Sequence, residues 1–326
     1  MAKTIFIEKK IFEHPRTTKI LNVIKARNII KIDHYGEIFN RNRQNFRIQK
    51  DNLNYIIATK RNNLVIPTPT STTLVKGYYF SHMYNCIYDC DYCFLQGHFN
   101  SAYHVYFINY EDFEKAIVNE SRKTKTKTWF FSGYDCDSLA SEKITGFAEH
   151  FVPLFSRLEN SILELRTKSS RTAELLKIKP NPNVVCAFSL NPQNIIDLFE
   201  KGTPSLSSRM RAVKSLSEKG WKIGLRFDPL ILAARHKDDY LELFELAVNC
   251  IPKDSIHSVS IGSLRLSESH HKKMVKNDMR NQLLFDNQYS YKEKLWQGDS
   301  EIRDVEIWLS KQLKKLIPQS SIFLSE

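Results

Sequence analysis

Long hydrophobic runs are missing from this chain of 326 residues, although hydrophobic residues make up 42% of it and can form a sizeable core. No stretch of about 18 uncharged apolar residues occurs, so we expect no membrane span. The N-terminal residues MAKTIFIEKKIFEHPRTTK lack the apolar core and the small-residue cleavage site of a secretory signal. Internal repeats and low-complexity tracts are also missing from the sequence. These absences predict a folded, cytoplasmic protein.

Cysteine is scarce, with only six residues in the chain. So few, unevenly placed cysteines do not make a disulfide scaffold for a chain of this length, and they favour a reducing cytosol. Three of them, Cys86, Cys90 and Cys93, nevertheless fall in the short segment YFSHMYNCIYDCDYCFLQGHF with the spacing C-x3-C-x2-C. Clustered cysteines in a reducing compartment indicate metal ligands.

Acidic residues are the minority among charged residues, with 36 Asp and Glu against 48 Lys and Arg, a net charge of +12. This balance favours an anionic partner, and nucleic acid is the first choice. The alternative is a set of solvated faces in a lysine-rich protein. Basic residues gather in three places, which together favour a polyanion: Arg41, Arg43, Arg47 and Lys50; Lys123, Lys125 and Lys127; and residues 270–276.

Short β-rich runs alternate with helical patterns from residue 76 onward, which is typical of βα units around a parallel sheet. Six strands and five crossover helices predict a partial (β/α)6 barrel, with a doubly wound sheet as the alternative; in both, the active site lies at the C-terminal ends of the strands. The expected strands are 77–81, 128–133, 162–168, 184–190, 222–228 and 256–264, and the expected helices are 110–122, 141–157, 171–178, 205–219 and 239–250.

Two other segments flank this α/β region. Residues 1–75 are predicted to form a small basic accessory segment that ends in the turn-rich PTPTSTT. Residues 76–265 would be the partial barrel. Residues 266–326 are charged and helix-like, and we expect a helical C-terminal extension there.

The metal at the cysteine cluster has two candidates. A structural zinc ion needs four closed ligands, and His82 or His98 is available as the fourth. A [4Fe–4S] cluster also binds closely spaced thiolates. Held by only three cysteines, it has one open iron that can bind a substrate or cofactor.

The C-x3-C-x2-C spacing after the first strand of a βα barrel, with an aromatic residue before the third cysteine, resembles the radical S-adenosylmethionine enzymes. The resemblance implies that Cys86, Cys90 and Cys93 hold a [4Fe–4S] cluster. It also implies that the open iron binds S-adenosylmethionine (AdoMet), whose cleavage gives a 5′-deoxyadenosyl radical. An electron donor such as flavodoxin or ferredoxin is implied as well.

A closer resemblance covers roughly residues 75–265 and, more loosely, the N-terminal segment. The pieces CDYCFLQ, DCDS, RTK, FSLN, FEKGTPS…R and KGWKIGLRFDP resemble, in this order, the spore photoproduct lyases. By position, Cys136 matches a thiol that donates a hydrogen atom. Ser138, Lys168 and Ser189 match residues that contact the cofactor, and Tyr92 matches an aromatic residue of the adenosyl pocket.

Cys136 also suits a donor role on its own chemistry. Its neighbours Asp135 and Asp137 raise the pKa of the thiol, and a hydrogen-atom donor needs an intact S–H bond. Cys186 and Cys250, by contrast, are read as small buried hydrophobic residues.

The sequence departs from the lyase pattern in two places. Phe94 stands where those lyases have a tyrosine that passes on a hydrogen atom, and a phenyl ring has no O–H bond to supply. A C-terminal Arg-Tyr substrate contact also has no counterpart in YSYKEKLWQGDSE.

Three functions therefore compete. The first is a radical lyase that repairs a thymine-dimer lesion in DNA. The second is a radical enzyme that acts on another nucleic-acid or small-molecule substrate. The third is a non-catalytic module that binds nucleic acid through zinc or an iron–sulfur cluster. The ordered motifs beyond the cysteine cluster favour the first two.

Overall fold

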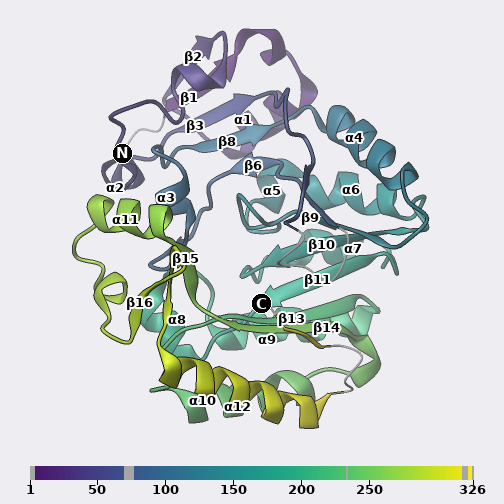
Figure 1. Ribbon diagram of the computed structural model, residues 1–326. Coiled ribbons are helices and arrows are strands. Elements are labelled where there is room, and N and C mark those ends of the chain that lie inside the picture. The colour runs from purple at the N-terminus through teal and green to yellow at the C-terminus, as the bar shows by residue number, and fades with distance from the viewer. Residues whose placement is uncertain (1–3, 70–76, 233, 318–321, 325–326) are drawn as a thin grey trace.

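Six parallel strands wrap around the centre of the molecule in the computed structural model, which describes residues 4–69, 77–232, 234–317 and 322–324 (Figure 1). They are neighbours in the same order as in the sequence, β5-β9-β10-β11-β13-β14. A doubly wound sheet would reverse this order at a switch point. The partial barrel is therefore confirmed. Its strands are β5 (Gly77–Tyr79), β9 (Thr128–Phe131), β10 (Ser161–Thr167), β11 (Val184–Ser189), β13 (Lys222–Leu230) and β14 (Ile256–Ser263).

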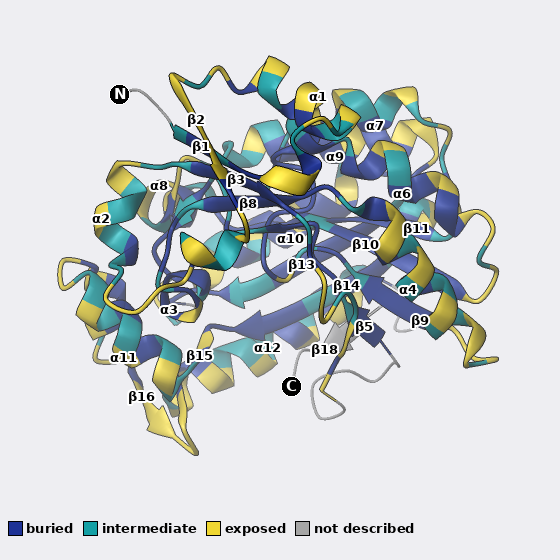
Figure 2. Ribbon diagram, turned by 90° about the horizontal axis from the view of Figure 1, so that it is seen from above, coloured by how far each residue is buried: buried dark blue, intermediate teal, exposed yellow. Residues whose placement is uncertain are grey.

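The helices between these strands lie outside the sheet, where each buries one side and exposes the other (Figure 2). One expected helix, 141–157, is broken into two, because Gly146 adopts a left-handed conformation with φ of +61° and ends the first of them. The short helix after β11 was not expected. The helices are α4 (Tyr110–Arg122), α5 (Glu142–Thr145), α6 (Phe147–Phe155), α7 (Ala173–Lys177), α8 (Gln193–Phe199), α9 (Leu206–Lys219) and α10 (Lys237–Asn249).

A second sheet packs at the start of the barrel and has the order β2-β1-β3-β8-β6. It combines residues before and after position 75. The sheet therefore spans the predicted boundary at residue 75, and the domain boundaries at residues 75 and 265 stay predictions. The strands are β1 (Thr4–Glu8), β2 (Asn28–Ile32), β3 (Tyr55–Ala58), β8 (His104–Phe107) and β6 (Met83–Tyr84), with helices α1 (Pro15–Val23) and α2 (Phe46–Asp51).

The C-terminal region contains two helices, α11 (Glu268–Asn277) and α12 (Ser300–Leu316), as its helix-like sequence suggested. It also contains a three-stranded antiparallel sheet that the sequence analysis missed. This sheet has the order β15-β17-β16, from Arg265–Ser267, Leu295–Gly298 and Tyr289–Lys292. Two short strands, β18 (Ile322–Leu324) and β4 (Ile66–Pro67), extend the edges of the main sheet. None of the described helices is long and apolar enough to cross a membrane.

A buried ion pair crosses the inside of the barrel between β10 and β13. Arg226 Nη2 lies 2.7 Å from Glu164 Oε2 and 2.9 Å from Ser258 Oγ of β14. Burial alone would raise the pKa of Glu164, but the Arg226 guanidinium overcomes it and holds that pKa below its usual value. The pair and the Ser258 hydroxyl thus join three strands through almost fully buried side chains that line the central cavity.

Replacing Arg226 with Met should lower the free energy of unfolding by about 3–5 kcal/mol, because Glu164 would keep a buried charge without its cation. The double variant Glu164→Leu, Arg226→Met should recover most of that loss, since it removes both charges. Urea unfolding of the apo-protein, followed by circular dichroism, measures both values. Equal losses in the single and double variants would contradict this account.

Candidate active site

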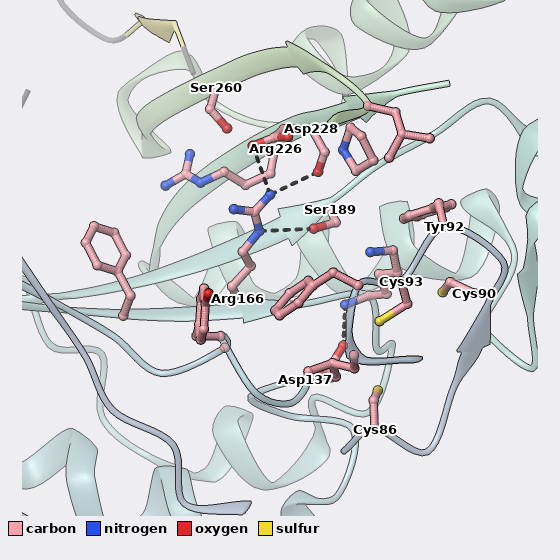
Figure 3. Close-up of a pocket in the computed structure, with 18 of the residues that line it drawn as sticks. Cys86, Cys90, Tyr92, Cys93, Asp137, Arg166, Ser189, Arg226, Asp228 and Ser260 are labelled. Atoms are coloured by element: carbon pink, nitrogen blue, oxygen red, sulfur yellow. Dashed lines mark hydrogen bonds and ion pairs between the residues drawn. The ribbon is translucent and has the colours of Figure 1, made fainter. Parts of the chain in front are cut away.

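The three clustered cysteines lie along one loop at the edge of a cavity. Cys86 follows β6, Cys90 ends β7 (Asp89–Cys90), and Cys93 precedes α3 (Leu95–His98). All three line a cavity of about 830 Å³, a size typical of ligand and cofactor sites. The cavity is also lined by residues at or just after the C-terminal ends of the barrel strands (Figure 3). The cysteines therefore lie at the expected end of the sheet.

Basic residues of α2 hold the cysteine loop. Lys50 Nζ donates hydrogen bonds to the carbonyl oxygens of Cys86 at 3.1 Å and Tyr88 at 2.9 Å. Arg47 Nη1 lies 2.8 Å from Asp89 Oδ2. The sequence analysis assigned both basic residues to a face for a polyanion. Their cationic groups bond to the cysteine loop, and contact of this face with a polyanion stays a prediction.

A short antiparallel strand pairing holds the other side of the same loop. Strand β12 (Glu200–Lys201), which follows α8, pairs antiparallel with β7 and sets Glu200 opposite Cys90. The ammonium group of Lys201 reaches back to the Asp91 carboxylate at 2.8 Å. The backbone of the cysteine loop is therefore fixed by a distant part of the chain.

Beneath this pairing lies a fully buried ion pair between Glu200 and Arg209. Glu200 Oε1 also accepts a hydrogen bond from the Tyr92 hydroxyl and one from Asn191 Nδ2 at 2.8 Å. Arg209 Nη1 donates to the Ser189 carbonyl oxygen at 3.0 Å. One buried carboxylate and one buried guanidinium thus connect the cysteine loop with the end of β11.

Three of the four predicted cofactor residues line the cavity with the cysteines: Tyr92, Lys168 and Ser189. The Lys168 ammonium lies 5.4 Å from the centroid of the Tyr92 ring. Ser138 is different. It is fully buried, its Oγ lies 2.8 Å from Ser132 Oγ, and it is not among the described residues that line the cavity.

Asp137 organises this part of the site, although the sequence analysis gave it no such role. Its Oδ1 accepts a 2.6 Å hydrogen bond from Thr167 Oγ1, and its Oδ2 accepts a 2.7 Å hydrogen bond from the Lys168 backbone N–H. It also accepts a 2.8 Å hydrogen bond from the Ala140 N–H. The carboxylate therefore joins the loop after β9 to the end of β10. The motif DCDS, which contains Asp137, was the sequence signal that could have indicated this role.

Cys136 lines the cavity but is only 5% exposed. Its Sγ lies 3.6 Å from the Ser132 carbonyl oxygen, to which the S–H donates, and 3.9 Å from His82 Nδ1. Burial raises the pKa of this thiol well above its usual value, and Asp135 and Asp137 raise it further. The expected direction of the shift is confirmed, with burial as its largest cause.

The cysteine loop fits an iron–sulfur cluster better than a closed zinc site. Cys86, Cys90 and Cys93 are free thiols on one cavity wall, and three thiolates with one open position suit a [4Fe–4S] cluster that binds a cofactor. The two histidines considered for zinc are not among the described residues of that wall. His82 stacks on Phe147 at 3.9 Å, and burial lowers its pKa to about 3; His98 lies 3.3 Å from His270 instead.

Phe94, the departure from the lyase pattern, also lines the cavity. Its ring centroid lies 5.2 Å from that of Tyr134, which in turn stacks on Tyr79 at 4.3 Å. The other two cysteines stand apart. Cys186 is fully buried in β11, and Cys250 lies at the end of α10.

A partial barrel with three cysteines after its first strand, beside a cavity at the strand ends, defines a radical AdoMet enzyme. More specifically, the chain belongs to the spore photoproduct lyase family, because the sequence model described as "Spore photoproduct lyase" matches residues 1–323. The resemblance seen in the motifs is thereby confirmed. The protein is a radical AdoMet lyase that uses a [4Fe–4S] cluster.

Individual relatives agree with this assignment. Spore photoproduct lyase of Clostridium acetobutylicum is 24% identical over 251 residues, which are 76% of this chain and 74% of that protein. Spore photoproduct lyase of Bacillus subtilis is 24% identical over 179 residues, 54% of this chain and 52% of that protein. A solved spore photoproduct lyase complexed with dinucleoside spore photoproduct has a TM-score of 0.84 at 16% identity, covering 100% of this chain and 98% of that one, and it shares the fold.

Changing any one of Cys86, Cys90 or Cys93 to Ala should reduce bound iron from about four atoms per chain to near zero, because two thiolates do not retain the cluster. Anaerobic reconstitution, iron analysis and the visible charge-transfer absorption measure the loss. Cys250→Ala is the matched control and should keep its iron. A cluster-bearing variant at any of the three positions would refute this assignment.

Lys168→Ala and Ser189→Ala should keep the cluster but weaken AdoMet binding by about tenfold each, because each removes one polar contact of the cofactor pocket. Ser138→Ala should change the affinity less, since the Ser138 hydroxyl bonds to Ser132 behind the cavity wall. Equilibrium dialysis with the reconstituted protein measures the affinities. Wild-type affinity in both Lys168→Ala and Ser189→Ala would show that the pocket lies elsewhere.

Proposed function

We propose that this chain is a spore photoproduct lyase that splits a crosslinked thymine dimer in DNA, with Cys136 as the hydrogen-atom donor. The observation that carries the proposal is that one cavity is lined by the three cluster cysteines, by three cofactor residues and by Cys136. The solved relative complexed with dinucleoside spore photoproduct, which has the same fold, supports the choice of lesion.

The cluster and AdoMet, when bound, supply a carbon-centred radical that can take a hydrogen atom from the lesion. The residues of the chain prepare this chemistry. Cys86, Cys90 and Cys93 provide the thiolates for the cluster. Lys168 and Ser189 would bind polar groups of the cofactor, and the Tyr92 ring, held by Glu200, would line the pocket for its adenosyl part.

The Cys136 thiol completes the reaction. Burial keeps it protonated, and its S–H points to the Ser132 carbonyl oxygen until a substrate radical comes within reach. The hydrogen atom then moves from sulfur to carbon, so that an S–H bond breaks, a C–H bond forms, and the unpaired electron remains on sulfur. Phe94 has no O–H bond from which a hydrogen atom could return to that sulfur, so the thiol regains its hydrogen atom by another route.

Partners and compartment follow from the same chemistry. A lesion inside a duplex must leave the base stack to enter the cavity, and the net charge of +12 favours binding to DNA phosphates. The cluster needs one electron from outside, which we assign to a small redox protein such as flavodoxin or ferredoxin. Because the three thiols must stay reduced for cluster assembly, we propose that the protein works in the cytoplasm.

Cys136→Ala should keep the cluster, AdoMet binding and AdoMet cleavage, but it should lose clean repair, because the first hydrogen abstraction precedes the need for the thiol. Loss of one buried sulfur should cost only about 1 kcal/mol of stability. Anaerobic turnover of irradiated DNA, with chromatography for thymine, side products and 5′-deoxyadenosine, separates the two steps.

Cys186→Ala serves as the matched control, since it removes a buried thiol outside the cavity and should repair at the wild-type rate. The donor role fails if Cys136→Ala restores thymine cleanly at that rate. The proposed function itself fails if the wild type cleaves AdoMet but never repairs the lesion.

A further inference from the structure

Three polar side chains gather in the part of the cavity that lies away from Cys86 and Cys90 in Figure 3. Arg166 stands near the end of β10, Asp228 on β13 and Ser260 on β14. Arg166 Nε lies 3.5 Å from the hydroxyl of Ser189, one of the expected cofactor residues, whereas Asp228 and Ser260 are not among those residues. Their position at the strand ends leaves them open to a ligand that enters the barrel.

Arg166 and Asp228 bond to each other, and each side chain still has a polar atom that can bond to a ligand. Arg166 Nη2 donates to the Asp228 carbonyl oxygen at 2.9 Å and to Asp228 Oδ2 at 3.3 Å. The two side chains remain 35% and 27% exposed. Within the described part of the chain, Arg166 Nη1 and Asp228 Oδ1 have no hydrogen-bond partner. One donor and one acceptor are therefore fixed side by side for a ligand.

Ser260 adds a third polar atom. Its Oγ is buried and has no hydrogen-bond partner among the described residues. Residues two apart on a strand face the same side, and Ser258 Oγ is bonded to Arg226 inside the barrel. Ser260 therefore also faces inward, one step nearer the open end. A buried hydroxyl without a partner costs free energy, which a ligand can recover.

Aromatic rings line the neighbouring wall. Phe131 stacks on Trp129 with centroids 5.8 Å apart, and Tyr79 lies 5.9 Å from Phe131 and 4.3 Å from Tyr134. All four line the cavity. Enzymes that act on a base outside the duplex place it against such rings and bind its edge with polar groups. The cavity offers both features at adjacent positions.

We propose that Arg166, Asp228 and Ser260 recognise the imide edge of a thymine ring in the lesion, an inference that rests on the proposed function. The imide presents C=O, N–H and C=O in a row, and it needs a donor, an acceptor and a donor. Arg166 Nη1 and the Ser260 hydroxyl donate to the two carbonyl oxygens, and Asp228 Oδ1 accepts the N3–H. A crosslink between carbon atoms leaves this edge intact.

The same arrangement rejects cytosine-type rings. Their ring nitrogen carries a lone pair where thymine carries N3–H, and this lone pair would face the Asp228 carboxylate. A site that is built to accept a hydrogen bond discriminates strongly against a ligand that lacks the donor. The three residues therefore act as specificity determinants for the lesion.

Methylation of N3 tests the central contact. The reconstituted protein with AdoMet is titrated anaerobically, by calorimetry, with dinucleoside spore photoproduct and with its analogue methylated at both N3 atoms. The wild type should bind the analogue at least about tenfold more weakly, because a charge-assisted hydrogen bond is lost. In Asp228→Ala, parent and analogue should bind alike, and the parent should bind about tenfold more weakly than to the wild type.

Asp228→Asn guards against misfolding, since its amide oxygen can still accept the Arg166 hydrogen bond while its NH₂ group opposes the N3–H. It should retain AdoMet affinity and lose lesion affinity. Asp304→Ala, an exposed change on α12, should behave as the wild type with both ligands. An equal methylation penalty in the wild type and Asp228→Ala overturns the inference, and so does equal binding of both ligands by the wild type. If the wild type repairs the lesion in either case, the proposed function still stands.

Discussion

The buried ion pair between Glu200 and Arg209 is the contact on which the geometry of the active site depends. Both side chains are fully buried, and removing two charges from water costs several kcal/mol for each ion, which only excellent geometry and further hydrogen bonds offset. The site meets that condition: Glu200 bonds to Tyr92 and Asn191, and Arg209 bonds to the Ser189 carbonyl. The pair therefore serves mainly to fix the positions of Tyr92, Asn191 and the Ser189 carbonyl group, and it adds little net stability.

Contacts from several other elements hold the cysteine loop in place. Glu200 fixes it through strand pairing, Lys50 binds two of its carbonyl groups, and Gln96 bonds to the Cys90 carbonyl at 2.8 Å. Across the cavity, the Asp137 carboxylate holds the backbone of Lys168 by accepting a hydrogen bond from its N–H. Preorganisation of this kind reduces the ordering cost of binding.

Local patterns predicted the barrel well because each of its strands is a buried run between clear turn signals, and the order of motifs carried the family resemblance. The strands β15–β17 escaped notice because they are short and partly exposed. At the site, the motif residues Lys168 and Ser189 line the cavity, whereas Ser138 turns its hydroxyl behind the wall. Contacts such as Tyr92 to Glu200, which lie 108 positions apart, leave no local signal because only the folded sheet brings them together.

The burial of Cys136 and the absence of a hydroxyl at Phe94 constrain the reaction together. A thiol that is 5% exposed reaches only a radical pressed against it, so the lesion must be positioned by contacts elsewhere in the cavity. The Arg166–Asp228 pair and the aromatic wall supply those contacts at the strand ends. After the hydrogen atom leaves, the unpaired electron stays on a sulfur atom that is buried in the same cluster as Tyr106. Phe94 has no hydroxyl group, so the hydrogen atom that restores the thiol cannot come from that side chain.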